Sequence, residues 1–385
     1  MTTRLGEAWL LLTGTAALLL LFLPFSPWTL LLALPVLYVG QASACPPGQA
    51  EARPTFWNLI DLFTLLLIAG YTKLASAATP IENDYLLIWG VKAKEFFHAG
   101  GIDWPWLELP TNHTAHPDYP ILLPLVYDAY ALVTGGWNDR WIGIITVAYG
   151  VAALLIVRGM LADELPKPWR VLATAALMPL VFSPYAGMAE APLIAFALAG
   201  LLRIRRGDTL RGAVFLGFAA FTKNEGLTLI VAAALALIAA KRWRELPRLW
   251  PAVAIPLPWL VLRTMHGLQT DLLVPGIFER LSARLADPWP VFAAIARYPV
   301  GNMLFWLGVA VAGLLGWRGI VTRERFLALT ILLQFLFFLA AYFVSPRDLD
   351  WHVQWSWERI VRQLLPLIAL LAIFANTTVQ ESVDG

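Results

Sequence analysis

Apolar residues dominate this sequence in long uninterrupted runs, and polar residues gather in the stretches between them. Runs of about 15–22 residues with few charges match the length that an α-helix needs to cross a bilayer. We expect membrane spans near residues 57–78, 141–158, 171–187, 190–204, 212–222, 226–240, 249–264, 301–317, 326–344 and 362–376. Because the run at 212–222 is short, we interpret it as half of a broken or tilted pair with 226–240.

The N-terminal stretch is basic and then leucine-rich, as in a cleavable signal peptide. No clean small-residue cleavage site follows residues 1–24, and a second apolar run comes at once at Trp28–Gly40. We therefore predict two membrane helices within residues 1–40, with a cleaved signal as the alternative.

Composition agrees with a membrane protein. Of the 385 residues, 59% are hydrophobic and 14% charged, whereas soluble domains have about 45–50% and about 25%. Disorder, nucleic-acid binding and a disulfide scaffold are excluded, since the net charge is only +2 and there is one cysteine. The predicted fold class is an all-α polytopic membrane protein with about 11–12 transmembrane helices, integral to the plasma (inner) membrane.

Lysine and arginine placement predicts the orientation of these spans, because cytoplasmic loops are rich in both residues. Basic clusters lie at 158–170, 203–211, 241–248 and 318–325. All four face the cytoplasm only if residues 121–134 do not cross, so we interpret that segment, which carries Asp128, as an interfacial or re-entrant piece on the outer side. The outer loops are then 80–140, 223–225, 265–300 and 345–361. Ionisable groups are missing from mid-span, which favours chemistry at the periplasmic or exterior face over transport.

The first outer loop contains a predicted interfacial amphipathic helix. Tyr85, Leu86, Trp89, Ala93, Phe96 and Phe97 share one helical face, while Asp84, Lys92, Glu95 and His98 occupy the other. Glu82 and Asp84 stand at its start. A carboxylate there has two interpretations: it caps the helix, or it is a general base that deprotonates a hydroxyl.

Further along this loop, Asn112–Pro120 contains His113, His116 and Asp118. Pro117 and Pro120 prevent helical presentation, and no third strong metal ligand is evident. The segment is either a plain exposed loop, a metal site, or a place where histidines bond to phosphate or sugar. We expect no cofactor, with a divalent metal as the less favoured alternative.

These motifs together resemble the GT-C superfamily of integral membrane glycosyltransferases, in the protein mannosyltransferase and aminoarabinose transferase-like branch. Glu82-Asn83-Asp84 is similar to the acidic motif of its first outer loop. The blocks His116–Pro124 and Gly136–Arg140 also fit that branch.

Three later stretches agree with the same family. Glu190 before Pro192 resembles a second outer acidic site, usually an Asp. Thr222-Lys223-Asn224-Glu225-Gly226 resembles a Thr-Lys-x-Glu-Gly corner. Residues 345–366 are similar to a late outer loop with a Ser-x-Asp-Arg pattern, although Glu358 replaces the Asp before Arg359. The resemblance covers residues 57–376 as a catalytic core with outer loop 80–140, and residues 1–40 look like an added helix pair.

The resemblance implies transfer of a sugar from a polyprenyl-phosphate carrier to an acceptor hydroxyl on a lipid, glycan or protein, with inversion. Asp84 would be the base, with Glu82 as its helper or as the base itself, and Glu190 would bind a sugar hydroxyl or orient the acceptor. Lys223 and Arg359 would bind the donor phosphate, and His116 and His352 would assist donor binding. The plainer interpretations are a capping acid for Glu190, a snorkelling side chain for Lys223, and an ion pair with Glu358 or Asp350 for Arg359.

Three other functions compete with this one. A transporter or lipid flippase would predict an internal repeat and mid-span polar residues, and the sequence has neither. A non-catalytic scaffold would leave the outer acids replaceable. A lipid phosphatase would need a concentrated Arg/His/Asp signature that is missing.

Overall fold

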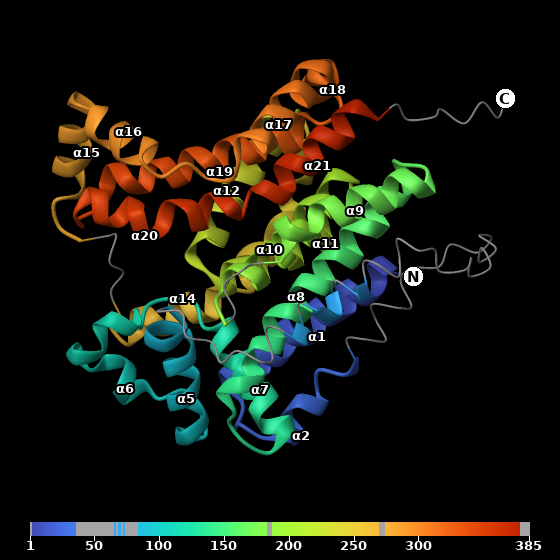
Figure 1. Cartoon of the computed structure of the whole chain (residues 1–385). Coiled ribbons are helices and arrows are strands. Elements are labelled where there is room, and N and C mark those ends of the chain that lie inside the picture. The colour runs from blue at the N-terminus through green and yellow to red at the C-terminus, as the bar shows by residue number, and fades with distance from the viewer. Residues whose placement is uncertain are drawn as a thin grey trace. The chain divides into compact units, whose positions relative to one another are not determined.

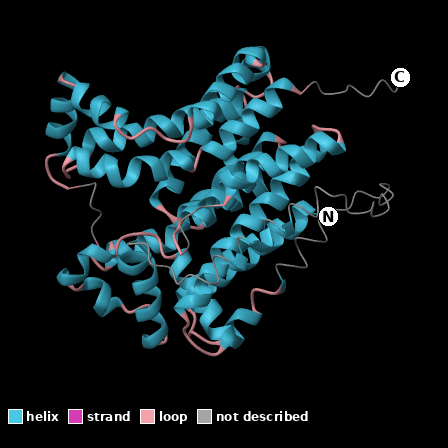
Figure 2. Cartoon of the chain, in the orientation of Figure 1, coloured by secondary structure: helices cyan, strands magenta, loops and turns pink. Residues whose placement is uncertain are grey.

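A computed structural model of the chain describes residues 2–35, 65–66, 68–70, 72–73, 84–182, 187–268 and 274–377. These described residues form helices joined by loops, with no strand among them (Figure 2). The all-α class is therefore confirmed for this part of the chain. Glu82, Cys45 and most of the predicted span at 57–78 lie outside it.

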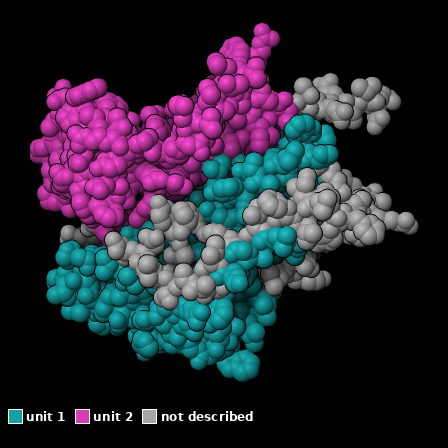
Figure 3. All heavy atoms as spheres, in the orientation of Figure 1, with its two compact units in different colours: residues 1–115, 120–199 teal, residues 116–119, 200–385 magenta. Residues whose placement is uncertain are grey.

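The chain divides into two compact units (Figure 3). Unit 1 comprises residues 1–115 and 120–199, and unit 2 comprises residues 116–119 and 200–385. Whether residues 1–40 are an addition to a core at 57–376 is a different question, and it stays a prediction.

Unit 1 is a set of helices around two long apolar ones. Its elements are α1 (Thr2–Phe22), α2 (Pro27–Leu31), η1 (Tyr85–Trp89), α5 (Gly90–Ala99), α6 (Trp104–Glu108), η2 (Pro110–Ala115), α7 (Leu122–Thr134), α8 (Asp139–Met160), η3 (Leu161–Asp163), α9 (Lys167–Val181) and the first part of α10 (Glu190–Arg205). The second predicted N-terminal membrane helix is described only as far as residue 35, where α2 is five residues long.

Helices α1 and α8 lie side by side and antiparallel (Figure 1). A side chain at Gly6 would meet the Ala152 carbonyl at 2.5 Å, and one at Gly159 would overlap Thr3. Near the middle, the Trp9 and Tyr149 rings are 6.4 Å apart. Small residues at both contacts let the two backbones approach, which is the usual way that helices associate in a membrane.

Unit 2 continues the helical chain. Its elements are the second part of α10, α11 (Thr209–Thr222), α12 (Asn224–Ala239), η4 (Trp243–Leu249), α13 (Trp250–Ala254), α14 (Leu257–Met265), α15 (Ile277–Ala286), α16 (Trp289–Ala296), α17 (Met303–Leu315), α18 (Trp317–Thr322), α19 (Arg325–Val344), α20 (Leu349–Arg362) and α21 (Leu365–Asn376). The single span predicted at 249–264 is interrupted at Pro256, which cannot donate a helical hydrogen bond, so the segment consists of the two helices α13 and α14, and its crossing of the membrane stays a prediction.

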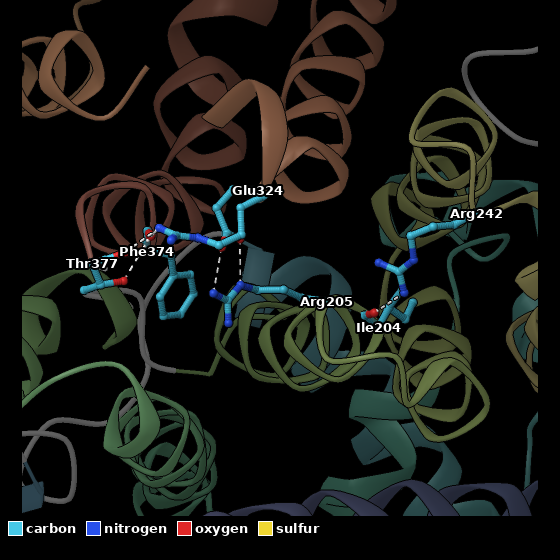
Figure 4. A network of polar contacts seen from close by, with 7 residues as sticks. Ile204, Arg205, Arg242, Glu324, Phe374 and Thr377 are labelled. Atoms are coloured by element: carbon cyan, nitrogen blue, oxygen red, sulfur yellow. Dashed lines mark hydrogen bonds and ion pairs between the residues drawn. The ribbon is translucent and has the colours of Figure 1, made fainter. Parts of the chain in front are cut away.

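A network of charged side chains connects the ends of helices in unit 2 (Figure 4). Arg205 binds the fully buried Glu324 carboxylate through two bonds of 2.6 and 2.7 Å, and its guanidinium lies 3.8 Å from the Phe374 ring centroid. Arg323 donates to the carbonyls of Phe374 and Thr377 at the end of α21. Bidentate, shielded bonds of this kind fix the start of α19 against the ends of α10 and α21.

Three described helices are long and apolar enough to cross a membrane: Thr3–Phe22, Asp139–Asp163 and Arg325–Val344. Five shorter apolar helices accompany them, namely Leu122–Thr134, Pro168–Val181, Thr209–Thr222, Asn224–Ala239 and Met303–Leu315. These helices are consistent with a membrane protein, and the total of 11–12 spans stays a prediction.

The apolar face predicted for the helix at 85–98 is confirmed at Tyr85, Trp89, Ala93 and Phe96, which are all buried. It is wrong at Leu86, which is 51% exposed and lies within the π-helical turn η1, where the spacing differs from a regular α-helix. Lys92 is also completely buried, with its ammonium 5.5 Å from the Trp89 ring centroid, because it lies at the edge of the same helical face as Trp89 and Phe96.

Candidate functional site

The junction of α11 and α12 places the predicted phosphate-binding residue Lys223 in the interior of unit 2. We call Lys223, Asn224 and Glu225 the recessed corner. Lys223 is 4% exposed, and its ammonium lies 2.8 Å from the Glu225 carboxylate. The plain interpretation of Lys223 as a snorkelling side chain is therefore wrong, since its charge is held inside the protein by a carboxylate.

The recessed corner lies beside the middle of α19. The Gln334 side-chain amide donates to the Glu225 carbonyl at 3.1 Å and to Thr228 Oγ1 at 2.9 Å. Ten residues separate Gln334 from Val344 at the end of α19, which corresponds to about 15 Å along a helix. The α11–α12 hairpin thus stops well short of the end of α19, because α11 has 14 residues and α19 has 20.

Hydroxyl groups from α19 and α20 continue from the corner toward the end of α19. The Tyr342 hydroxyl lies 2.8 Å from Ser356 Oγ, which donates to the His352 carbonyl. The charges of Glu225 and Arg359 both act on the Tyr342 hydroxyl. Two of the predicted binding residues in unit 2, His352 and Arg359, thus lie near one tyrosine, with the His352 and Tyr342 ring centroids 4.9 Å apart.

The two acids named as plain partners of Arg359 have other partners. Glu358 accepts two bonds from Arg362, the shorter at 2.6 Å, and Asp350 accepts one from Arg297 at 2.6 Å.

His352 is held in a cationic environment. Its Nδ1 lies 2.7 Å from Ser345 Oγ. Burial, with the charges of Arg347 and Arg284, lowers the pKa of His352 to about 4. At neutral pH the ring is uncharged, so any contact that it makes with a donor phosphate would be a hydrogen bond and not an ion pair.

Two arginines of α15 cap the end of α19. Arg284 donates to the carbonyls of Tyr342 (2.5 Å) and Ser345 (2.9 Å), and Arg280 donates to that of Val344 (2.9 Å). The last carbonyls of a helix have no partner within it. The α15 arginines supply these partners and fix the position of Tyr342 and Ser345.

Unit 1 holds the predicted acids near tyrosines. Asp84 precedes η1, and its carboxylate makes no capping bond to that helix, so the capping interpretation is wrong. The next residue, Tyr85, packs edge-on against Tyr127, with ring centroids 6.2 Å apart. Glu190, the first residue of α10, is 2% exposed and acts electrostatically on the Tyr127 hydroxyl.

Several side chains of the same region of unit 1 donate hydrogen bonds to the Asp139 carboxylate. It accepts hydrogen bonds from Tyr85 (2.7 Å), Lys94 (2.9 Å) and Trp137 Nε1 (3.0 Å). Burial and the bond to Asp139 raise the pKa of Tyr85, so its phenol is a fixed hydrogen-bond donor at neutral pH. The structure thereby ties the residue after Asp84 to the start of α8.

The histidine-containing loop has an unexpected conformation. His116 has a left-handed φ of 48° and stacks on Tyr119, with ring centroids 4.5 Å apart. Arg263 of α14 donates to the Asp118 carbonyl at 3.3 Å, and the Asp118 side chain is buried. Within the described ranges no group of three or more His, Cys, Asp or Glu residues is arranged to hold a metal ion.

Among the candidate residues, the predicted cation-rich set falls in unit 2, and Asp84 and Glu190 fall in unit 1. Four contributors escaped the sequence argument: Tyr85, Tyr127, Tyr342 and the buried Lys92. The tyrosines lie on apolar faces and look like core residues in a hydropathy pattern. The charge of Lys92 suggests the polar face, although it lies three residues after Trp89 and four before Phe96, at the edge of their buried face.

A comparison of the chain with protein-family models, curated proteins and solved structures found no match. The resemblance to the GT-C superfamily therefore depends on the ordered sequence motifs alone, and the function has to be argued from the residues themselves.

Proposed function

We propose that this chain is an integral membrane glycosyltransferase of the polyprenyl-phosphate-sugar-dependent kind, with its active site at the outer face of the plasma membrane. It would transfer the sugar to an acceptor hydroxyl on a lipid, glycan or protein, with inversion. The observation that carries the proposal is the recessed corner, because it holds the ammonium of Lys223, 4% exposed, inside a unit built of apolar helices.

A lipid-linked phosphate needs such a position. Its polyprenyl chain lies in hydrocarbon, so a cation that binds the phosphate at the edge of the bilayer has to be held near or below the headgroup level. A charged side chain inside a membrane is costly and indicates a functional site by default. Glu225 balances Lys223 in the absence of ligand, and Arg359 is the second cation available to the phosphate.

The chemistry assigns different tasks to the two groups of residues. As the bond from the sugar to the phosphate breaks, negative charge grows on the phosphate oxygens, and Lys223 and Arg359 would stabilise that charge. The acceptor hydroxyl must lose a proton as it attacks the opposite face of the anomeric carbon. Asp84, with Glu82, would accept this proton, and Glu190 would hold the sugar or the acceptor. The proposal requires no metal.

The test is release of polyprenyl phosphate from a panel of polyprenyl-phosphate sugars by purified protein. Asp84→Asn preserves size and removes the base, so we expect a fall of about 10²–10⁴-fold. Lys223→Met removes the ammonium and should cost about 10²–10³-fold. Asp163→Asn, an exposed carboxylate on η3, serves as the matched control and should retain full activity.

The possible outcomes test the roles of individual residues separately from the reaction itself. Equal release by the wild type and Asp84→Asn would transfer the role of base to Glu82 or Glu190. A protein that retains its thermal transition but releases nothing from any donor would overturn the proposal.

A transporter or lipid flippase is the alternative. The recessed ion pair Lys223–Glu225 favours it to some extent, because a translocation path also needs ionisable groups at depth. A flippase would move an intact fluorescent polyprenyl-phosphate sugar across a proteoliposome without breaking its glycosidic bond.

A further inference from the structure

An open pocket of about 410 Å³ lies in unit 1, between the end of α7 and the start of α8. This volume is typical of sites for small molecules. The lining residues are aromatic, hydroxyl, amide or glycine: Tyr130, Thr134, Gly135, Gly136, Trp137, Asn138 and Trp141. None of the candidate catalytic residues lines it, so the proposed function leaves this pocket without a role.

Trp137 is held in a fixed orientation in the pocket wall. Its Nε1 donates to Asp139 at 3.0 Å, the Phe97 ring is 6.1 Å away, and the Lys94 ammonium is 5.9 Å from the indole centroid. A tryptophan of an interfacial belt directs its N–H toward the headgroups. The N–H of Trp137 instead bonds within the protein, which indicates a built aromatic platform.

The other side of the pocket is bare backbone. Gly135, with a φ of +79°, ends α7, and Gly136 follows it. A Cβ at either glycine would meet no atom within 4 Å. The two N–H groups bond to the Ala131 carbonyl, so this wall offers a ligand carbonyl oxygens and open space, next to the polar side chains of Thr134 and Asn138.

We propose that this pocket binds an uncharged pyranose ring. Such a ring has an apolar C–H face that packs on tryptophan and tyrosine, and a rim of hydroxyls that bond to peptide, hydroxyl and amide groups. An uncharged ligand fits because none of the described residues that line the pocket has a charged side chain.

The binding of a pyranose ring is argued from the pocket alone. The identity of the substrate that carries this ring rests on the proposed function. Tyr85 binds Asp139, the residue after Asn138 of the pocket, and directly follows the proposed base Asp84. The pyranose in this pocket is accordingly assigned to the acceptor, with its hydroxyl to be deprotonated.

Binding is measured by saturation-transfer NMR titration of methyl pyranosides (gluco, galacto, manno and xylo, both anomers). The protein is kept in an amine-oxide detergent, which has no sugar headgroup to compete. Two variants alter the pocket: Gly136→Leu fills it, and Trp141→Ala removes one aromatic face. Gly101→Leu and Trp169→Ala are the matched controls, since Gly101 also has open space around it and Trp169 is 64% exposed on α9.

We expect at least one pyranoside to bind, with the strongest transfer to the ring protons of one face. Both pocket variants should weaken it by about 5–10-fold or more, and the controls should match the wild type. The proposal is overturned if no pyranoside binds, or if the pocket variants bind as the wild type does. It is also overturned if Gly136→Leu changes only the amount of co-purified lipid. No lipid-linked donor is present, so failure here and failure of polyprenyl phosphate release are independent results.

Discussion

The protonation of a single residue, His352, should make the stability of the fold depend on pH. Its pKa is lowered to about 4 by burial and by neighbouring arginine charges, while in the unfolded chain it titrates near about 6.5. Between these two values the unfolded state binds the proton and the folded state does not. The free energy of unfolding should therefore fall as the pH drops from about 7 to 4, by up to about 1.4 kcal/mol per pH unit, and this loss should level off below pH 4.

The measurement compares the thermal midpoint of wild type and His352→Gln at a series of pH values from 7.5 to 4.5. Gln keeps a hydrogen-bonding group near Ser345 and does not titrate, so the difference between the two proteins should change in favour of the variant as the pH falls. A difference that is constant with pH would contradict the neutral, buried state of His352.

At the scale of elements, the fold was predictable where one helix follows one apolar run. Helices α8 and α19 begin and end within a few residues of the runs at 141–158 and 326–344, because their lengths and compositions leave no alternative. The errors have local backbone causes. Pro256 interrupts a run that hydropathy shows as continuous, and the π-turn at Tyr85–Trp89 places Leu86 outside the buried face.

The recessed corner was predictable in its residues and not in its depth. The sequence places Lys223 and Glu225 between two short apolar runs, which is typical of a loop outside the membrane. Only the bonds from Gln334 show that the hairpin ends beside the middle of α19. That depth is a tertiary property, since neither helix of the hairpin contains a signal for the length of its neighbour.

The corner itself depends on Gly226. A Cβ there would collide with the backbone of Ala219 and Ala220 in α11. We expect Gly226→Ala to lower stability by about 1–3 kcal/mol as the hairpin opens, and to reduce polyprenyl phosphate release because Lys223 moves with it. Gly308→Ala in α17 is the control: no atom lies within 4 Å of its Cβ, so its midpoint should be equal or higher. Equal midpoints in the two variants would show that α11 yields at this contact.

Helix α15 should lie in the membrane interface. Its arginines donate hydrogen bonds to carbonyls at the end of α19. Its exposed apolar residues Phe278 (79% exposed) and Leu285 (62%) lie on one side of the helix. Glu279 lies about 100° around the helix from Phe278, and Arg280 lies on the opposite side. A helix at the end of a span, apolar on one side and polar on the other, fits the boundary between hydrocarbon and water.

Because Cys45 is the single cysteine, a Cys45→Ser background allows nitroxide labels at Phe278→Cys and at the exposed polar position Glu279→Cys. In proteoliposomes, oxygen should relax the first label more strongly and a water-soluble nickel chelate the second. The same accessibility at both positions would place α15 in water.

At the scale of the whole molecule, motif order along the chain predicted which residues are functional candidates, and it did not predict their division between two compact units. The acidic motif at Asp84 and Glu190 lies in one unit, and Lys223, His352 and Arg359 lie in the other. Hydropathy carries no information on this division, because α10 runs through the boundary as one uninterrupted helix. A catalytic role for both sets requires that the two units work together, which polyprenyl phosphate release by variants of each unit would show.

The orientation of the chain is testable with the same cysteine-free background. Lysine and arginine placement puts loop 80–140 outside and residues 241–248 inside, with five spans between them. Thr114 and Arg244 are both exposed, so Thr114→Cys should react with a membrane-impermeant maleimide in right-side-out vesicles. Arg244→Cys should react only in inside-out vesicles. The reverse pattern would invert the molecule and place the proposed chemistry in the cytoplasm. Labelling of both from one side would mean an even number of crossings, which leaves one of the helices α8 to α12 outside the set of true spans.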